Sequence, residues 1–332
     1  MTIETNAGAL KCYTCFSPVN FNGIGTPTLN EPTGEDIPQT DYLVLTWTVA
    51  ETCAFALVFG CGKYQILGME ENNNLYSYTD PTVSYTVEKE DGGCHGFWFP
   101  FRIGDKTCIG FKSNIHPKEK EQTAPMQAVI ENLIKKVNPQ YLVTSGTSGG
   151  VWPIMDIGDV VVGNSTRYGL SLVKEMDDST FWQSDVDITG SKPEGNYNTW
   201  YDYVNDTFLN NACTVNELRT GPQPRKNTAN PQVFYQAPEG SKTTVITNIS
   251  FTDEYKDLDT YRQFGAALEE NDSFVVQACQ TAGFNSWAVV RNISDLPQPT
   301  EDQSQSDDQY DIYGLCSSLN GAFGVWAFIM GH

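Results

Sequence analysis

Carboxylates stand at two points where an apolar segment of this chain turns polar. Glu51 follows the stretch LVLTWTVA, and Asp295 follows the stretch WAVVRNIS. A third group of carboxylates lies between them in the sequence: Glu269, Glu270 and Asp272. Positioned carboxylates can serve as general acid and general base, so the chain carries the residue types needed for acid/base cleavage of a glycosidic bond.

The segment SGTSGG, residues 145–150, follows the apolar residues LV and is rich in hydroxyl groups and glycine. Its backbone N–H groups and hydroxyls could bind water or an anion. The sequence has no nucleophile elbow with a Ser–His pair, no Walker loop and no dinucleotide fingerprint. The chemistry available is therefore a set of carboxylates beside a segment that can bind water or an anion.

Each of these features also has a purely structural interpretation. Glu51 could be an acid that stabilises a helix N-terminus, and Asp295 could cap a following helix. The glycine-rich segment could be a plain turn, and His116 could be an ordinary loop residue.

Composition excludes several classes of function. The chain has 332 residues with 39% hydrophobic and 12% aromatic content, which is typical of a globular protein. Its formal net charge of −21 argues against binding nucleic acid or an anionic membrane through charge. No run of about 18 apolar residues and no secretory signal are evident, which predicts neither a membrane span nor export.

The nine cysteines are scattered and several lie in apolar runs, which favours a reducing cytoplasm. Cys12 and Cys15 form a CxxC pair without a second pair or a histidine cluster, so we expect a surface turn and no metal site.

Apolar periodicity predicts strands that alternate with helices. Strands are expected within 41–51, 140–150, 157–169, 242–251 and 287–290, a hairpin within 95–113, and helices within 51–60, 124–139, 261–283 and 307–332. This order predicts a three-layer α/β/α sandwich with a central mixed twisted sheet over residues 41–332. Residues 1–40 are expected to be an irregular extension. Ligands of such sheets bind at the carboxyl ends of the strands, where the polar segments lie.

Three motifs occur in order: VTSGTSGG, IGDVVVGNSTRYG and AVVRNISDLP. Together they resemble the purine nucleoside phosphorylase / methylthioadenosine nucleosidase superfamily. That family has a Gly-Ser/Thr-x-Gly-Gly segment, then a Gly-Asp strand followed by Arg-Tyr or Arg-Phe, then Val-Arg-x-x-Ser-Asp. LVLTWTVAE and FKSNIH also fall where the family has its first strand and an early loop that approaches the sugar. The resemblance covers about residues 41–332.

The resemblance implies roles for individual residues. Asp295 matches the aspartate that protonates the imidazole-ring nitrogen of a departing purine, a role that requires a raised pKa. Glu51 matches the glutamate that activates water, and Thr147 matches the residue that binds that water or a phosphate. Phe251 matches an aromatic residue stacked on the base. The other implied substrate-binding residues are Ser148, Gly149, Glu270, Asn271, Ser294 and His116.

One position departs from the family pattern. The family has a Met-Glu pair at a helix start, whose glutamate binds the ribose hydroxyls. Counting 23 residues back from Asp295 reaches Asp272, with Asn271 in place of methionine. A one-residue gap would shift the match to Asn271, and Glu270 is also close. Asp272 is the preferred counterpart, and because aspartate is shorter than glutamate the identity of the substrate stays open.

The resemblance alone does not indicate whether the co-substrate is water, as in hydrolysis, or phosphate, as in phosphorolysis. Phosphorolysis needs arginines that hold phosphate, and Thr144 stands where hexameric phosphorylases have one. The early glycine-rich phosphate loop also has no counterpart here, although Lys112 or Arg291 could still contribute a charge. We therefore expect a nucleosidase that uses water to release the base of a purine nucleoside or nucleotide. A phosphate-dependent phosphorylase and a non-enzymatic nucleoside-binding protein are the alternatives. A homo-oligomer and no cofactor are implied.

Overall fold

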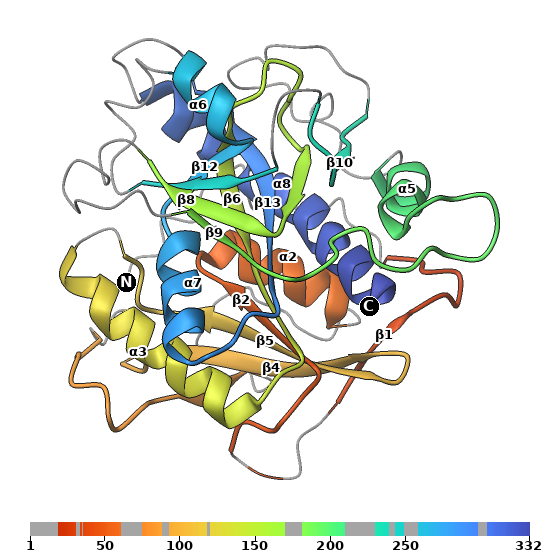
Figure 1. Cartoon of the computed structure of the whole chain (residues 1–332). Helices are drawn as coiled ribbons and strands as arrows, with labels where there is room; N and C mark the ends of the chain where they lie inside the picture. Colours follow the sequence, from red (N-terminus) through yellow and green to blue (C-terminus); the bar gives the residue numbers. More distant parts are fainter. Residues whose placement is uncertain are drawn as a thin grey trace.

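The computed structural model describes residues 19–30, 34, 36–60, 75–87, 93–117, 120–169, 181–209, 230–238, 243–248, 258–297 and 304–332. In this part of the chain a mixed sheet of 13 strands forms the middle layer (Figure 1). Helices α2 (Val49–Phe59) and α8 (Ser304–Gly331) cover one face, together with the short α5 (Trp200–Val204). Helices α3 (Lys120–Val137) and α7 (Asp272–Thr281) cover the other. The predicted three-layer α/β/α sandwich is confirmed.

The centre of the sheet consists of three parallel strands, β2 (Tyr42–Thr46), β6 (Tyr141–Gly150) and β13 (Trp287–Asp295). Their residues are almost all buried, because helices lie on both faces. The alternation of side chains sends Val44 and Val143 to the face of α2 and α8, and Leu43 and Leu142 to the face of α3 and α7.

The remaining strands extend this sheet on both sides. They are β1 (Pro27–Leu29), β3 (Tyr76–Tyr78), β4 (Gly96–Ile103), β5 (Lys106–Ser113), β7 (Val160–Gly163), β8 (Ser165–Tyr168), β9 (Phe181–Gln183), β10 (Val233–Phe234), β11 (Val245–Thr247) and β12 (Ala267–Glu269). A π-helix covers Asn205–Leu209, and α6 covers Leu258–Phe264. Strand β1 pairs with β4, so part of the predicted N-terminal extension belongs to the sheet.

One edge of β6 changes partner halfway along. Strand β2 pairs with β6 from Tyr141 to Thr144, and β12 pairs with it in the opposite direction at Gly149 and Gly150. The carboxyl ends of β2 and β12 therefore point toward each other on either side of the 145–148 segment of β6. Helix α2 follows β2 and α7 follows β12, so two helix N-termini converge at this segment.

The long helix predicted over 261–283 is wrong. The chain instead forms α6, then β12, then α7. A Cβ at Gly265 would lie 2.3 Å from the carbonyl oxygen of Thr244, so the chain approaches the sheet closely where the helix was expected to continue. The fully buried Ala267 and Leu268 then enter the sheet. Likewise SGTSGG, predicted as a loop after its strand, continues β6 to Gly150.

The hairpin and the C-terminal helix are confirmed, and α3 begins a little earlier than expected, at Lys120. Within α8, Gln309–Gly331 is long and apolar enough to cross a membrane, with a mean hydropathy of 1.3, although no such run was recognised in the sequence. Of that window 94% is buried inside the protein, so α8 is the central helix of one core layer.

Candidate active site

The junction between β2 and α2 fixes the carboxylate of Glu51. Thr48 caps the helix, and its hydroxyl accepts a hydrogen bond from the backbone N–H of Glu51. In return, Glu51 Oε2 accepts hydrogen bonds from the backbone N–H groups of Trp47 (2.8 Å) and Thr48 (2.9 Å). This reciprocal capping box follows from the sequence TVAE and holds the side chain at the helix N-terminus.

The other oxygen of Glu51 faces β6. Glu51 Oε1 accepts hydrogen bonds from the backbone N–H of Thr147 at 2.8 Å and from its hydroxyl at 2.9 Å. Strand β2 has ended by this point, so the carboxylate takes the place that a neighbouring strand would occupy. Glu51 is only 2% exposed and receives two hydrogen bonds at each oxygen, which fills the acceptor capacity of a carboxylate.

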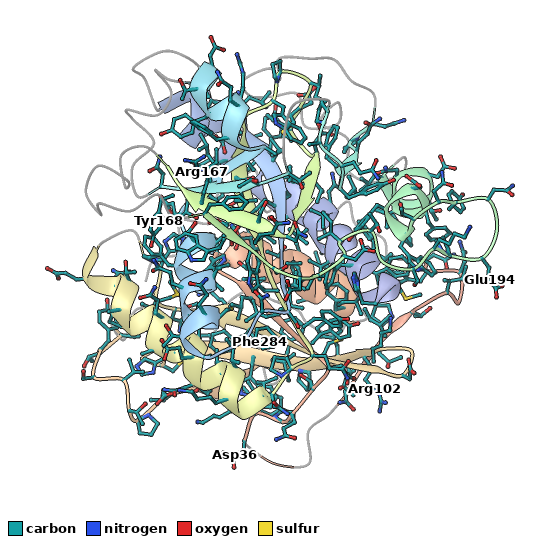
Figure 2. The ribbon with its side chains drawn as sticks, in the orientation of Figure 1. Asp36, Arg102, Arg167, Tyr168, Glu194 and Phe284 are labelled. Carbon is teal, nitrogen blue, oxygen red and sulfur yellow. The ribbon has the colours of Figure 1, made fainter. Side chains whose placement is uncertain are left out.

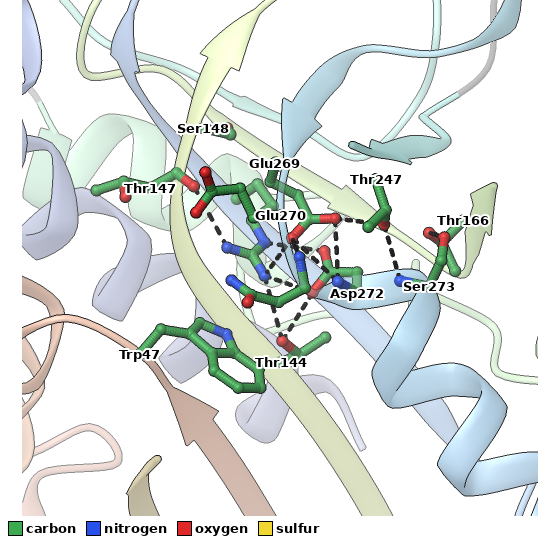
Figure 3. Close-up of polar contacts among 12 residues, drawn as sticks. Trp47, Thr144, Thr147, Ser148, Thr166, Thr247, Glu269, Glu270, Asp272 and Ser273 are labelled. Carbon is green, nitrogen blue, oxygen red and sulfur yellow. Dashed lines mark hydrogen bonds and ion pairs between the residues drawn. The ribbon is translucent and has the colours of Figure 1, made fainter. Parts of the chain in front are cut away.

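The junction between β12 and α7 fixes a second carboxylate, that of Asp272 (Figure 3). Asp272 Oδ1 accepts a hydrogen bond from the Thr144 hydroxyl at 2.8 Å, and Arg291 donates to both of its oxygens. The Asp272 side chain is completely buried. This two-point contact between a guanidinium and a carboxylate is a strong and directional interaction.

Arg291 contacts two carboxyl groups, those of Asp272 and Glu269. From β13 its guanidinium donates to Asp272 and to the carbonyl oxygen of Thr147 (3.3 Å), and Nη2 lies 3.0 Å from Glu269 Oε2. Burial lowers the pKa of the Arg291 guanidinium, but the charges of Asp272 and Glu269 outweigh that effect and raise it overall. Arg291 is therefore charged despite being 1% exposed.

Gly146 gives these groups room. A Cβ at this position would lie 2.6 Å from Arg291 Nη1 and 2.8 Å from Glu51 Oε1. Any larger residue would push apart the guanidinium and the carboxylate. This glycine of the SGTSGG motif is thus required for the close approach of two charged side chains.

Glu269 is the third buried carboxyl of the cluster. It accepts hydrogen bonds from the Thr247 hydroxyl (2.5 Å) and from the backbone N–H groups of Asn271 and Asp272. Burial, followed by the charge of Asp272, raises the pKa of Glu269 to about 8, and Arg291 opposes the shift only in part. Glu269, Asp272 and Arg291 thus form one buried cluster, in which the guanidinium lies against both carboxyl groups.

Asp295 lies further along β6, at the end of β13. A bulge between Ile293 and Asp295 shifts the register, so that Asp295 pairs with Gly149. A Cβ at Gly149 would lie 3.2 Å from Asp295 Oδ2, and the Ser294 hydroxyl donates to Oδ1 at 2.9 Å. Thr147 and Gly149 are two residues apart and point to the same face of β6. Glu51 and Asp295 therefore contact β6 at positions two residues apart along the strand.

His116 and Glu270 lie at the partly exposed side of the same region. His116 Nδ1 is 3.5 Å from Glu270 Oε2, and the two side chains are 22% and 21% exposed. The ring of Trp47 meets the His116 ring edge-on, with 6.3 Å between centroids. The ends of β2, β5 and β12 thus bring these three residues together.

The structure places most of the predicted site residues in one region. Glu51, Thr147, Asp272, Glu270, Asn271 and His116 surround the 145–148 segment, and Gly149, Ser294 and Asp295 lie at its far end. Ser148 instead points toward β13, where its hydroxyl donates to the Asn292 carbonyl oxygen at 3.3 Å. Phe251 lies outside the described residues.

Sequence reasoning missed the central role of Arg291 and the contributions of Glu269 and Trp47. An arginine inside an otherwise apolar strand was the available signal for Arg291. Arg167 (Figure 2), by contrast, is half-buried with its guanidinium 4.1 Å from the Phe264 ring centroid. Among the described residues, no group of three or more His, Cys, Asp or Glu side chains is arranged to hold a metal ion.

Solved structures with a similar fold include several nucleosidases. Futalosine hydrolase of Helicobacter pylori is 15% identical with a TM-score of 0.52, covering 87% of this chain and 96% of its own. A 5'-methylthioadenosine/S-adenosylhomocysteine nucleosidase from Neisseria meningitidis, bound to methylthio-immucillin-A, is 12% identical with a TM-score of 0.54, covering 88% and 100%. S-adenosylhomocysteine nucleosidase from Streptococcus pyogenes is 15% identical with a TM-score of 0.53, covering 89% and 98%. No protein-family model and no curated protein sequence matches the chain.

Proposed function

We propose that this chain, which has the nucleoside phosphorylase-like fold that its motifs predicted, is a nucleosidase. It would hydrolyse the N-glycosidic bond of a purine nucleoside or nucleotide and release the base. One observation carries the proposal: the Glu51 carboxylate is held against the N–H and hydroxyl of Thr147, and Asp295 lies beside Gly149, two residues further along the same strand. Two carboxyl groups thus lie beside neighbouring positions of β6, at the carboxyl ends of the strands.

The two carboxyl groups suit hydrolysis with inversion. The bond from the anomeric carbon to the base lengthens first, and Asp295 gives its proton to the departing purine nitrogen. Water then forms the new bond to the anomeric carbon from the opposite face and gives its proton to Glu51. Inverting glycosidases use two carboxyl groups in these two roles, with room for a water molecule between them.

Thr147 supplies the position for that water. All four hydrogen bonds to Glu51 come from donors in the protein, and three of these donors are backbone N–H groups whose direction is fixed. Only the Thr147 hydroxyl can rotate away. A water molecule can therefore take its place on Glu51 Oε1 and accept the displaced hydroxyl hydrogen.

Phosphorolysis is less compatible with the same groups. The Thr147 N–H and hydroxyl, which could bind a phosphate, are occupied by the anionic side chain of Glu51. The buried Arg291 is paired with Asp272 and Glu269. Lys112 donates to Asn114 Oδ1 at 2.7 Å. We therefore propose water rather than phosphate as the co-substrate.

We further propose a homo-oligomer that acts on a small molecule in the cytoplasm. Cys94, Cys108 and Cys279 are buried free thiols, which fits a reducing compartment. Cys316 on α8 is disulfide-bonded, which argues the other way. Thiol labelling of the protein as isolated from cells, before and after reduction, decides whether that bond exists where the protein works.

The test of the proposed function is base release from a nucleoside panel. Purified protein is incubated with adenosine, inosine, methylthioadenosine and adenine nucleotides, with and without phosphate, and the products are separated by chromatography. We expect free purine from at least one substrate at a rate that does not depend on phosphate. A requirement for phosphate would instead show a phosphorylase, and no release from any substrate would contradict an enzymatic role.

The variant Asp295→Asn tests the leaving-group step. Asparagine cannot donate the acid proton, so base release should fall by about 100- to 10,000-fold, the usual contribution of a general acid. Circular dichroism should be unchanged. The matched control is Asp36→Asn, an exposed aspartate far from the site (Figure 2), which should retain full activity. Full activity in Asp295→Asn would remove this residue from the mechanism.

A further inference from the structure

Asp272, the expected ribose-binding residue, is buried in an ion pair and is not accessible to a substrate. Both of its oxygens accept hydrogen bonds from Arg291, and Oδ1 also accepts one from Thr144. Its side chain is completely buried. Binding a sugar hydroxyl would require breaking a buried ion pair, which costs several kcal/mol. Other groups must therefore bind the sugar if the proposed function holds, and the inference below rests on that function.

Two nearby side chains do have unused hydrogen-bonding capacity. Within the described part of the chain, the indole N–H of Trp47 and the amide oxygen Oδ1 of Asn271 have no hydrogen-bond partner. Both residues are only 3% exposed. A buried polar atom without a partner costs about 1–3 kcal/mol, so two of them beside a candidate active site call for an explanation.

Asn271 is placed where its side chain would ordinarily cap a helix. It occupies the N-cap position of α7, yet its side chain makes no capping hydrogen bond. Asparagine is among the preferred residues at an N-cap because its oxygen can accept from the first helical N–H groups. Here Glu269 accepts from the Asn271 and Asp272 N–H groups instead, which leaves the asparagine oxygen unused.

Trp47 and Asn271 lie at opposite ends of the same segment of β6. Trp47 follows β2 and Asn271 follows β12, the two strands whose carboxyl ends point toward each other across 145–148. A chain of contacts joins them: the Trp47 ring meets His116, and His116 contacts Glu270, the residue before Asn271. The Trp47 backbone N–H also donates to Glu51, so Trp47 is in direct contact with the candidate general base.

We propose that Trp47 and Asn271 bind the sugar and determine specificity for it. The Trp47 indole N–H donates to a sugar hydroxyl oxygen, and Asn271 Oδ1 accepts a hydrogen bond from a sugar hydroxyl. The ligand group is uncharged, because Glu51 and Glu270 flank it and the nearby guanidinium of Arg291 is already paired. The substrate is thus a nucleoside with a free hydroxyl at this position of its sugar.

The test compares sugar preference across variants. The values of kcat/KM are measured for adenosine and for its 2′-, 3′- and 5′-deoxy forms in the wild type, Trp47→Phe and Asn271→Leu. A site built to bind a hydroxyl should favour adenosine over one deoxy form by about 10- to 100-fold or more. Both variants should lose most of that preference, at the same hydroxyl, chiefly by slowing cleavage of adenosine.

Trp152→Phe is the matched control. The Trp152 indole N–H is also buried without a partner among the described residues, at 2% exposure, but it packs in the core against Phe234. The control loses the same atoms and should keep the wild-type preference. Comparing Trp47→Phe with Trp152→Phe therefore separates two effects of the substitution: the loss of packing, which both variants share, and the loss of the hydrogen bond to the substrate.

The outcomes separate this inference from the proposed function. If the wild type releases base but Trp47→Phe and Asn271→Leu keep its sugar preference, or slow every substrate equally, the inference is wrong and the nucleosidase stands. If no base is released, the same comparison is made with dissociation constants for adenosine and its deoxy forms. A preference lost in both variants then supports the inference without catalysis, and absence of adenosine binding overturns it.

Discussion

The β2–α2 and β12–α7 junctions have the same plan but hold their carboxylates differently. In each, a strand ends beside the 145–148 segment, a helix begins, and an acid lies in the first turn of that helix. Glu51 is bound by backbone N–H groups and one hydroxyl. Asp272 is bound by a guanidinium and by Thr144.

The difference shows which carboxylate can take part in a reaction. The ion pair that Arg291 makes with both oxygens of Asp272 is buried and resists rearrangement. In the part of the chain that the structure describes, Glu51 makes no ion pair, and the rotatable Thr147 hydroxyl can give up its acceptor position to water. The junction with the arginine therefore stabilises the structure, whereas the junction with backbone donors is suited to acid/base chemistry.

Removing Arg291 should have the largest effect. Arg291→Met leaves Asp272 buried without its counter-charge, so we expect the free energy of unfolding to fall by about 3–5 kcal/mol. Denaturant titration measures the change. Arg167→Met is the control, because that half-buried guanidinium stacks on Phe264 and its loss should cost only about 1 kcal/mol. Equal losses of unfolding free energy in both variants would show that the buried ion pair stabilises the fold no more than the stacked Arg167 does.

Glu51→Gln should leave the fold intact and remove activity. The amide oxygen of glutamine can still accept hydrogen bonds from Trp47 and Thr48. Its amide nitrogen cannot accept from the Thr147 N–H and cannot take a proton from water. Base release should fall by about 1,000-fold, equivalent to about 4 kcal/mol. The control is Asp202→Asn, which alters a second capping box, that of Thr199 and Asp202 on α5, outside the site. If Glu51→Gln kept its activity, Glu51 would be only a helix-capping residue and not the general base.

Substitutions of two threonines of β6, Thr147 and Thr144, should affect different properties, the first mainly activity and the second mainly stability. Thr147→Val removes the rotatable donor to Glu51, and we expect kcat/KM to fall by about 10- to 100-fold with little loss of stability. Thr144→Val removes the hydrogen bond to Asp272 and should cost about 1–2 kcal/mol of stability with smaller kinetic effects. Kinetics and unfolding are measured for both. The opposite pattern would reverse the roles assigned to the two junctions.

The first junction could be predicted from the sequence because its signals are local. The residues TVAE contain the complete capping box, and the apolar segment before them marks the strand. The order of the three motifs also predicted the fold. Local signals suffice here because a cap forms between residues three positions apart.

The second junction was hidden because its partners are distant in sequence. Asp272 meets Arg291, 19 residues away, and Thr144, 128 residues away. Strand β12 has only three residues, too few for a periodic pattern, so the helical pattern on either side concealed it. Burial of an arginine in β13 follows from tertiary pairing, which spacing alone does not indicate.

A pH dependence of stability provides the smallest and most specific test of the buried cluster. Burial and Asp272 raise the pKa of Glu269 from an ordinary 4.5 to about 8. Below pH 4.5 the carboxyl is protonated in both the folded and unfolded states, so its favourable contribution is fully present. Between pH 4.5 and 8 only the unfolded state releases the proton, and stability falls by at most about 1.4 kcal/mol per pH unit.

Glu269→Gln removes this titration while keeping an acceptor for Thr247. The difference in unfolding free energy between wild type and variant should therefore decline as pH rises from 4.5 to 8 and become constant above that range. Glu121→Gln, an exposed residue in the first turn of α3, should show no comparable change over this interval. A pH-independent difference for Glu269→Gln would mean that Arg291 keeps Glu269 ionised, and both Glu269 and Asp272 would then share its charge.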